Sequence, residues 1–196
     1  MTAGIWQFVT DLGDSAVTVT LAGFILFFLV ARERWRQVGA WAVSVAVCAI
    51  GTMAVKLLFH SCLLITPAAN ISGHTAMSTT VYGGLALLLT TRSIRWPGYA
   101  TYLAAILLVL AIAASRIILH AHQWCEVLAG LAVGVASVLL FRQLAGPGER
   151  PIPVAGLLTG AAILAVLMHG IRWPGEAYLV QLAALFRAAG MDCGQL

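Results

Sequence analysis

Two short segments of this chain combine residue types that can handle an anionic group. Residues 70–75 read Asn-Ile-Ser-Gly-His-Thr, and further along Ser115-Arg116 is followed by His122 and then by Glu126. An arginine can bind the oxygens of an anion, a histidine can attack or transfer a proton, and a carboxylate four residues after a histidine can orient the imidazole. We name these segments the Ser-Gly-His motif and the Arg-His-Glu motif, and together they predict a site for phosphate chemistry.

The Ser-Gly-His motif opens an apolar stretch that we expect to be helical. Ser72 is a good N-cap residue, Gly73 permits close approach to the backbone, and the free N–H groups of a helix start attract anions. His74, in the first turn, could then give a proton to a departing oxygen. The alternative is that Ser72 only caps the helix and that His74 points toward water at the membrane edge.

The Arg-His-Glu motif predicts an activated nucleophile. If a helix begins at His122, Glu126 lies one turn later on the same face, where its carboxylate can hold one ring nitrogen and leave the other free to attack. Arg116 suits bidentate contact with phosphoryl oxygens. The alternative is a buried His–Glu pair that only ties helices together, with Arg116 marking a helix end.

The composition indicates an integral membrane protein. The 196 residues include only eleven Lys or Arg and seven Asp or Glu, and the mean hydropathy is +0.97. Such a chain is too apolar for a soluble domain of this size. The net charge of +4 comes from arginines scattered over short breaks, which argues against nucleic-acid binding. We therefore expect one all-α domain over residues 1–196, a polytopic helix bundle in the lipid bilayer.

Apolar blocks separated by arginine-containing breaks predict about six transmembrane helices. We place these spans at residues 16–31, 38–59, 72–90, 97–119, 122–141 and 151–169. Residues 1–15 are expected to form a short N-terminal interfacial helix, and residues 174–189 a second surface helix. In a five-span alternative, residues 151–169 would be a re-entrant or surface element.

The basic residues predict the orientation of these spans. Seven of the eleven lie in the breaks after the first, third and fifth spans: Arg32, Arg34, Arg36, Arg92, Arg95, Arg142 and Arg150. By the positive-inside rule this side is the cytoplasm, so both motifs, Lys56 and His60 are expected near the outer face. Even numbers of crossings separate these groups, and they should therefore meet at one end of the bundle.

With Lys56, the two motifs resemble the signature of the type 2 phosphatidic acid phosphatase family of membrane lipid phosphatases, over residues 56–141. That family has a Lys followed after six residues by Arg-Pro, then Pro-Ser-Gly-His, then Ser-Arg, five residues, His, three residues and Asp. Here Ile71 replaces the Pro and Glu126 replaces the Asp, while Leu63-Leu64 stands where Arg-Pro is usual.

The resemblance implies a metal-independent phosphatase without a cofactor. It implies that His122 attacks phosphorus to form a phosphohistidine, that His74 protonates the leaving group, and that Glu126 orients His122. It also implies four groups around the phosphoryl oxygens: Lys56, Ser72, Gly73 and Arg116. From their positions alone, His60 and Asn70 are candidates to replace part of the missing arginine.

The implied substrate is a lipid phosphate or pyrophosphate, for example undecaprenyl pyrophosphate, phosphatidylglycerol phosphate or phosphatidate. The implied location is a bacterial inner membrane, crossed several times, with the active site facing the periplasm or exterior. Two other functions stay open. The chain could bind a lipid phosphate without cleaving it, because one cation is missing. It could also use histidines as metal or haem ligands, the chemically suitable residues being His74, His120, His122 and Glu126.

Overall fold

The computed structural model describes residues 2–62, 70–90, 96–146, 153–173 and 175–188, and every regular element in these ranges is an α-helix. The helices are α1 (Thr2–Asp11), α2 (Ser15–Ala31), α3 (Trp35–Cys62), α4 (Gly73–Thr90), α5 (Trp96–Ile118), α6 (Trp124–Ala145), α7 (Val154–Met168) and α8 (Gly175–Ala188). The predicted all-α class is confirmed for this part of the chain.

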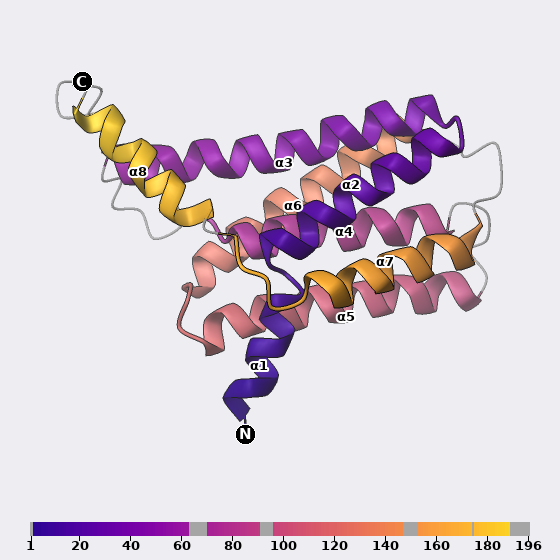
Figure 1. The fold of residues 1–196 in the computed structure, drawn as a ribbon, viewed down its shortest axis with the longest axis horizontal. Coiled ribbons are helices and arrows are strands. Elements are labelled where there is room, and N and C mark those ends of the chain that lie inside the picture. Colours follow the sequence, from indigo (N-terminus) through magenta and orange to yellow (C-terminus); the bar gives the residue numbers. More distant parts are fainter. Residues whose placement is uncertain (1, 63–69, 91–95, 147–152, 174, 189–196) are drawn as a thin grey trace.

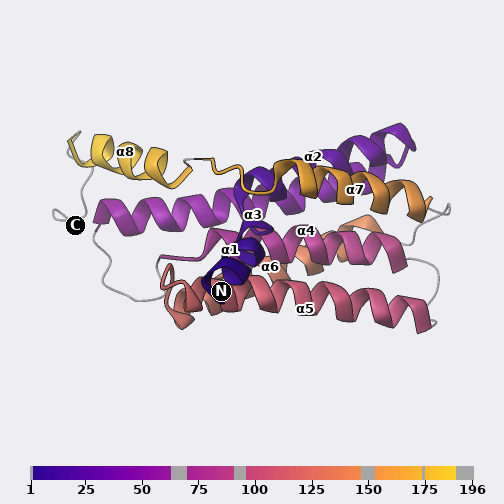
Figure 2. The same ribbon diagram turned by 60° about the horizontal axis from the view of Figure 1, so that its bottom comes forward.

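Helices α2 to α7 run side by side as a bundle, while α1 and α8 extend from one end of it (Figures 1 and 2). The six predicted spans coincide with α2 to α7 apart from small shifts at their ends. By length and composition, four stretches could cross a membrane: Gly4–Ala31, Trp35–His60, Gly98–Ile118 and Trp124–Ala145. The protein is therefore a multi-pass helical membrane protein, and the number of six crossings stays a prediction.

The core of the bundle centres on Trp41 of α3. Its indole N–H donates to the carbonyl of Ala22 in α2 at 2.9 Å, and its ring meets Phe141 of α6 edge-on with centroids 5.3 Å apart. Large apolar side chains also cover the outside of the bundle, among them Phe27, Leu103 and Val166. An apolar exterior of this kind suits solvation by lipid chains.

Two glycines of α6 allow it to pack closely on α4. A Cβ at Gly130 would lie 2.6 Å from the carbonyl oxygen of Ser72, and a Cβ at Gly134 would lie 2.4 Å from Cβ of Thr79. Small residues four apart permit such close helix packing in membranes. This pair was not singled out in the sequence. Its close contacts let the Ser-Gly-His motif pack directly on the first turns of α6.

The helix ends that carry the predicted site lie at one end of the bundle. The C-terminal ends of α3 and α5 and the N-terminal ends of α4 and α6 share that end in both views (Figures 1 and 2). Arg32, Arg34, Arg36 and Arg142 belong to the opposite helix ends. The prediction that dispersed motifs meet at one end is therefore confirmed. Arg92, Arg95, Arg150 and Leu63-Leu64 lie outside the described residues.

Candidate active site

His122 and Glu126 form a buried, hydrogen-bonded pair. Nδ1 of His122 lies 2.6 Å from Oε2 of Glu126, and the same oxygen accepts the backbone N–H of Gln123 at 3.0 Å. Because a carboxylate only accepts hydrogen bonds, Nδ1 carries the proton and Nε2 keeps its lone pair. The pair thus presents one nucleophilic nitrogen.

The predicted helix start at His122 is wrong by two residues. Helix α6 begins at Trp124, with Gln123 as its N-cap. The carboxylate of Glu126 accepts the N–H of Gln123, a capping interaction that starts the helix later in the chain. The predicted pairing still holds, because the same carboxylate also reaches back to the imidazole.

The five-residue spacing inside the Arg-His-Glu motif is a closed turn. The carbonyl oxygen of Arg116 accepts the N–H of Ala121 at 3.0 Å and that of His122 at 3.1 Å. His120, exposed at the tip, has a φ of 54° in the left-handed region, which lets the chain reverse. The turn therefore brings His122 back to the end of α5, where Arg116 lies.

A backbone hydrogen bond joins the two motifs. The N–H of Ser72 donates to the carbonyl oxygen of Glu126 at 3.1 Å. The Ser72 hydroxyl accepts the N–H of Thr75 at 3.4 Å and lies 2.9 Å from the Thr75 hydroxyl, so it caps α4 as predicted. The start of α4, with Gly73 in its first turn, is thereby fixed beside the His122–Glu126 pair.

Burial and two nearby positive charges favour the neutral form of His122. Burial is the main reason why the pKa of His122 lies below the ordinary value of 6.5, and the positive charges of Arg116 and Lys56 lower it further. The hydrogen bond that His122 donates to Glu126 opposes this shift without reversing it. Lys56 itself is buried in α3. The result is an imidazole that is uncharged at neutral pH, as a nucleophile requires.

His74 contacts a residue that the sequence analysis did not include in the site. It is half-buried in the first turn of α4, and its Nε2 lies 3.5 Å from Oδ2 of Asp14. Asp14 belongs to the turn between α1 and α2, some sixty residues earlier in the chain. A contact over such a separation leaves no local pattern from which it could be predicted.

Two other predicted binding residues, His60 and Asn70, each have a buried polar atom without a partner among the described residues. Nε2 of His60 and Oδ1 of Asn70 are buried and have no hydrogen-bond partner within the described part of the chain. Thr52, one turn before Lys56, has a similar unpartnered hydroxyl, and its Cγ2 lies 3.9 Å from where a Cβ of Gly73 would be. The part that His60 and Asn70 play in binding stays a prediction, and Thr52 is a candidate that sequence reasoning missed.

The ligand geometry does not favour the metal or haem hypothesis. Within the described ranges, no group of three or more His, Cys, Asp or Glu side chains is arranged to hold a metal ion. His120 is exposed at the tip of its turn whereas His122 is buried against Glu126. The two imidazoles thus occupy different environments.

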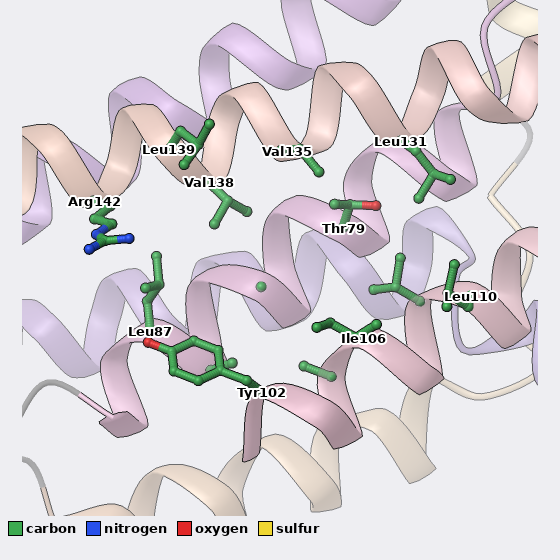
Figure 3. Close-up of a pocket in the computed structure, with 14 residues that line it drawn as sticks. Thr79, Leu87, Tyr102, Ile106, Leu110, Leu131, Val135, Val138, Leu139 and Arg142 are labelled. Carbon is green, nitrogen blue, oxygen red and sulfur yellow. The ribbon is translucent and has the colours of Figure 1, made fainter. Parts of the chain in front are cut away.

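An apolar cavity of about 400 Å³ lies between α4, α5 and α6 (Figure 3). Thr79, Leu110 and Leu131 line its part nearer the site end of the bundle, and Leu87, Tyr102 and Arg142 line the opposite part. Apart from Arg142, its lining side chains carry no charge. A pocket of this size and polarity suits a hydrocarbon chain.

Fold and site together define a helical membrane protein with a buried histidine–carboxylate pair and cations at one end of its bundle. The sequence model of the PAP2 superfamily matches residues 60–147, which contain both motifs. Over these residues the chain is similar to the PAP2 superfamily, in agreement with the motif resemblance. This similarity indicates phosphatase activity on lipid phosphates.

A curated relative extends the similarity beyond that segment. An "Uncharacterized 22.5 kDa protein in cps region" of Klebsiella pneumoniae is 27% identical over 187 residues, covering 91% of this chain and 90% of the relative. No solved structure matches the chain. The similarity to this relative therefore extends well beyond the two motifs.

Proposed function

We propose that this protein hydrolyses a lipid phosphate or pyrophosphate at the outer leaflet of a bacterial inner membrane through a phosphohistidine. The observation that carries the proposal is the buried His122–Glu126 pair, with a 2.6 Å hydrogen bond on Nδ1 and the positive charges of Lys56 and Arg116 nearby. This arrangement supplies a neutral nucleophile next to cations that attract a phosphoryl group.

The proposed reaction has two steps. First, Nε2 of His122 attacks the terminal phosphorus, the P–O bond to the lipid alcohol or to the lipid monophosphate breaks, and His74 gives a proton to that leaving oxygen. Next, water attacks phosphorus, the P–N bond to Nε2 of His122 breaks, His74 takes up a proton from that water, and inorganic phosphate leaves. Glu126 keeps the His122 ring oriented in both steps by holding Nδ1–H.

The phosphoryl oxygens would be held by Lys56, Arg116 and the start of α4. Ser72 uses its hydroxyl to cap that helix, so its contribution is to fix the helix start, where the amide of Gly73 can face an anion. His60 and Asn70 would add polar contacts to the head group. No step requires a metal ion.

The proposed substrate is a lipid because an apolar cavity lies between the same helices that carry the motifs. The tail would enter sideways from the bilayer and occupy the space between α4, α5 and α6, as undecaprenyl pyrophosphate or phosphatidate could. The position of the arginine-bearing helix ends opposite the site supports an outward-facing head-group site.

The test is a phosphate-release assay on purified protein in lipid vesicles, with a panel of polyprenyl and glycerolipid phosphates. We expect release from at least one lipid and its loss in H122A. The matched control is H120N, which changes an exposed histidine to a residue that tolerates the left-handed conformation. Release from no lipid, or undiminished release by H122A, would contradict the proposal.

Binding of a lipid phosphate without hydrolysis is the second candidate function. It is favoured by Leu63-Leu64, which stand where the family's Arg-Pro supplies a phosphate contact. Loss of one such contact lowers a phosphoryl-transfer rate by about 10²- to 10³-fold, which a slow enzyme survives. Saturable binding of a lipid phosphate with no phosphate release would favour this second function.

A further inference from the structure

The turn between α1 and α2 reaches into the site from outside the segment that matches the superfamily. Nη1 of Arg116 donates to the hydroxyl of Thr10 at 3.0 Å, and the hydroxyl of Tyr82 donates to the carbonyl of Leu12 at 2.7 Å. Asp14 faces His74 from the same turn. The N-terminal turn, residues 10–15, therefore contacts α4 and α5, the helices that bear His74 and Arg116.

Asp14 is held in place independently of His74. Its Oδ1 accepts the N–H of Ala16 at 3.0 Å as the N-cap of α2, and its carbonyl oxygen accepts both the N–H and the hydroxyl of Thr18. The residue is buried, with 8% of its surface exposed. Oδ1 is thus used for capping and Oδ2 is directed at the imidazole. The backbone N–H of Trp173 also contributes a hydrogen bond to this carboxylate.

We propose that Asp14 is a positioning residue for His74, a role that rests on the proposed phosphatase function. During reaction the protonated His74 keeps Nε2–H toward Asp14 and gives its Nδ1 proton to the leaving oxygen as the P–O bond breaks. The neutral ring that remains is held by Asp14 until it takes a proton from the attacking water. A fixed carboxylate of this kind aims the ring and stabilises the imidazolium that a general acid must carry.

The two histidine–carboxylate pairs thus have different geometries and different roles. The Nδ1–Oε2 distance of 2.6 Å in the His122–Glu126 pair fits a neutral nucleophile held in one tautomer. The Nε2–Oδ2 distance of 3.5 Å in the His74–Asp14 pair fits an ion pair that forms when His74 is charged. Each carboxylate belongs to a helix start, Glu126 to α6 and Asp14 to α2.

The competing explanation is that Asp14 only caps α2. D14N separates the two roles, because asparagine is as good an N-cap as aspartate but carries no charge. The matched control is D11N, since Asp11 is equally buried in the same segment but contacts Gln7 at 2.9 Å and Arg172 at 3.5 Å. Thermal unfolding of both variants reports whether the fold is kept.

The activity test compares kcat and KM of the full-length protein in lipid vesicles for wild type, D14N, D11N, H74A and D14N/H74A. We expect D14N to lower kcat by about tenfold or more with little change in KM, and D11N to stay near wild type. In the H74A background D14N should add no further loss, because both act on the same proton transfer. A wild-type kcat in D14N, or losses that multiply in the double variant, would overturn the proposal.

A second readout does not depend on turnover. In protein with nitrogen-15-labelled histidine, the His74 signals are assigned by their loss in H74A, and the Nε2 signal should move in D14N but stay in D11N. If the wild type released no phosphate from any lipid, the phosphatase function would fail, and this signal would still decide whether Asp14 holds the ring. An unmoved His74 signal in D14N would overturn the pairing.

Discussion

The backbone N–H of Ser72 donates to the carbonyl oxygen of Glu126 at 3.1 Å. This hydrogen bond connects two residues that lie more than fifty positions apart in the chain, and it does so in the first turn of α6, next to the carboxylate that holds His122. The helix start that would face the phosphoryl group and the nucleophile that would attack it are therefore parts of one rigid unit.

Shortening the carboxylate at position 126 should slow the enzyme, although the family usually has aspartate there. Glu126 already reaches Nδ1 of His122 at 2.6 Å, so E126D would withdraw the carboxylate by about an ångström and lower kcat by roughly tenfold or more. The measurement is phosphate release by E126D and wild type under identical conditions. A kcat for E126D that equals or exceeds the wild-type value would contradict this account.

Filling the space at Gly130 should destabilise the protein and impair the site. In G130A the new Cβ would lie 2.6 Å from the carbonyl oxygen of Ser72, so α4 and α6 must separate, which costs about 1 to 3 kcal/mol. The control is G51A on α3, where a Cβ meets no atom within 4 Å. Thermal unfolding in detergent checks both. Equal unfolding temperatures for G130A and G51A would show that the close approach does not matter.

The apparent pKa on the acid limb of the pH–rate profile should lie below 6.5, the ordinary value for histidine. Burial, Arg116 and Lys56 lower the pKa of His122 from 6.5, so the nucleophile stays neutral, and kcat/KM stays high, down to pH values below 6.5. Removing one positive charge in K56Q should raise that pKa and move the limb upward. R32Q, at the far end of the bundle, should leave the limb in place. A wild-type limb at or above pH 6.5 would contradict the prediction.

The same lowered pKa has a consequence for stability. The folded protein binds the proton at His122 more weakly than the unfolded chain, so stability rises with pH where the unfolded imidazole is protonated. This contribution is fully present above pH 6.5 and is lost as the pH falls through 6.5 toward the lowered pKa. Denaturant unfolding of wild type and H122N across this range measures it. An identical pH dependence in both proteins would be evidence against the shift.

Removing the hydroxyl that holds Arg116 should weaken substrate binding. T10V keeps the side-chain shape but deletes the acceptor that lies 3.0 Å from Nη1 of Arg116. We expect KM to rise several-fold, because the guanidinium loses one of the contacts that aim it. T80V is the control, since the hydroxyl of Thr80 bonds the carbonyl of Ala76 in its own helix. Equal KM values in T10V and T80V would show that the Thr10 hydroxyl does not position Arg116 for substrate binding.

Local patterns in the sequence predicted the helices and one pair of the site. The apolar blocks predicted α2 to α7, and the four-residue spacing predicted the contact between His122 and Glu126. The exact start of α6 was missed because Glu126 serves two partners, the imidazole of His122 and the N–H of Gln123. Spacing reveals that a contact is feasible but does not show where the helix begins.

Contacts between distant elements could not be predicted in the same way. Asp14 reaches His74, and Thr10 reaches Arg116, only because the end of α1 and the turn that follows it pack on α4 and α5. Neither pair has a periodic spacing, and neither Asp14 nor Thr10 lies in the motif segment. The Gly130–Gly134 pair was not singled out from the sequence, and its contact with α4 depends on the packing of the whole bundle.

The central claim is that His122 becomes covalently phosphorylated, and rapid quenching with a lipid whose terminal phosphate is radiolabelled tests it most directly. We expect the wild-type protein to carry bound radiolabelled phosphate that survives alkali and is released by acid, as is typical of a phosphohistidine. We expect the same label on H120N and none on H122A. Phosphate release without any protein-bound label, or label that persists in H122A, would contradict the account.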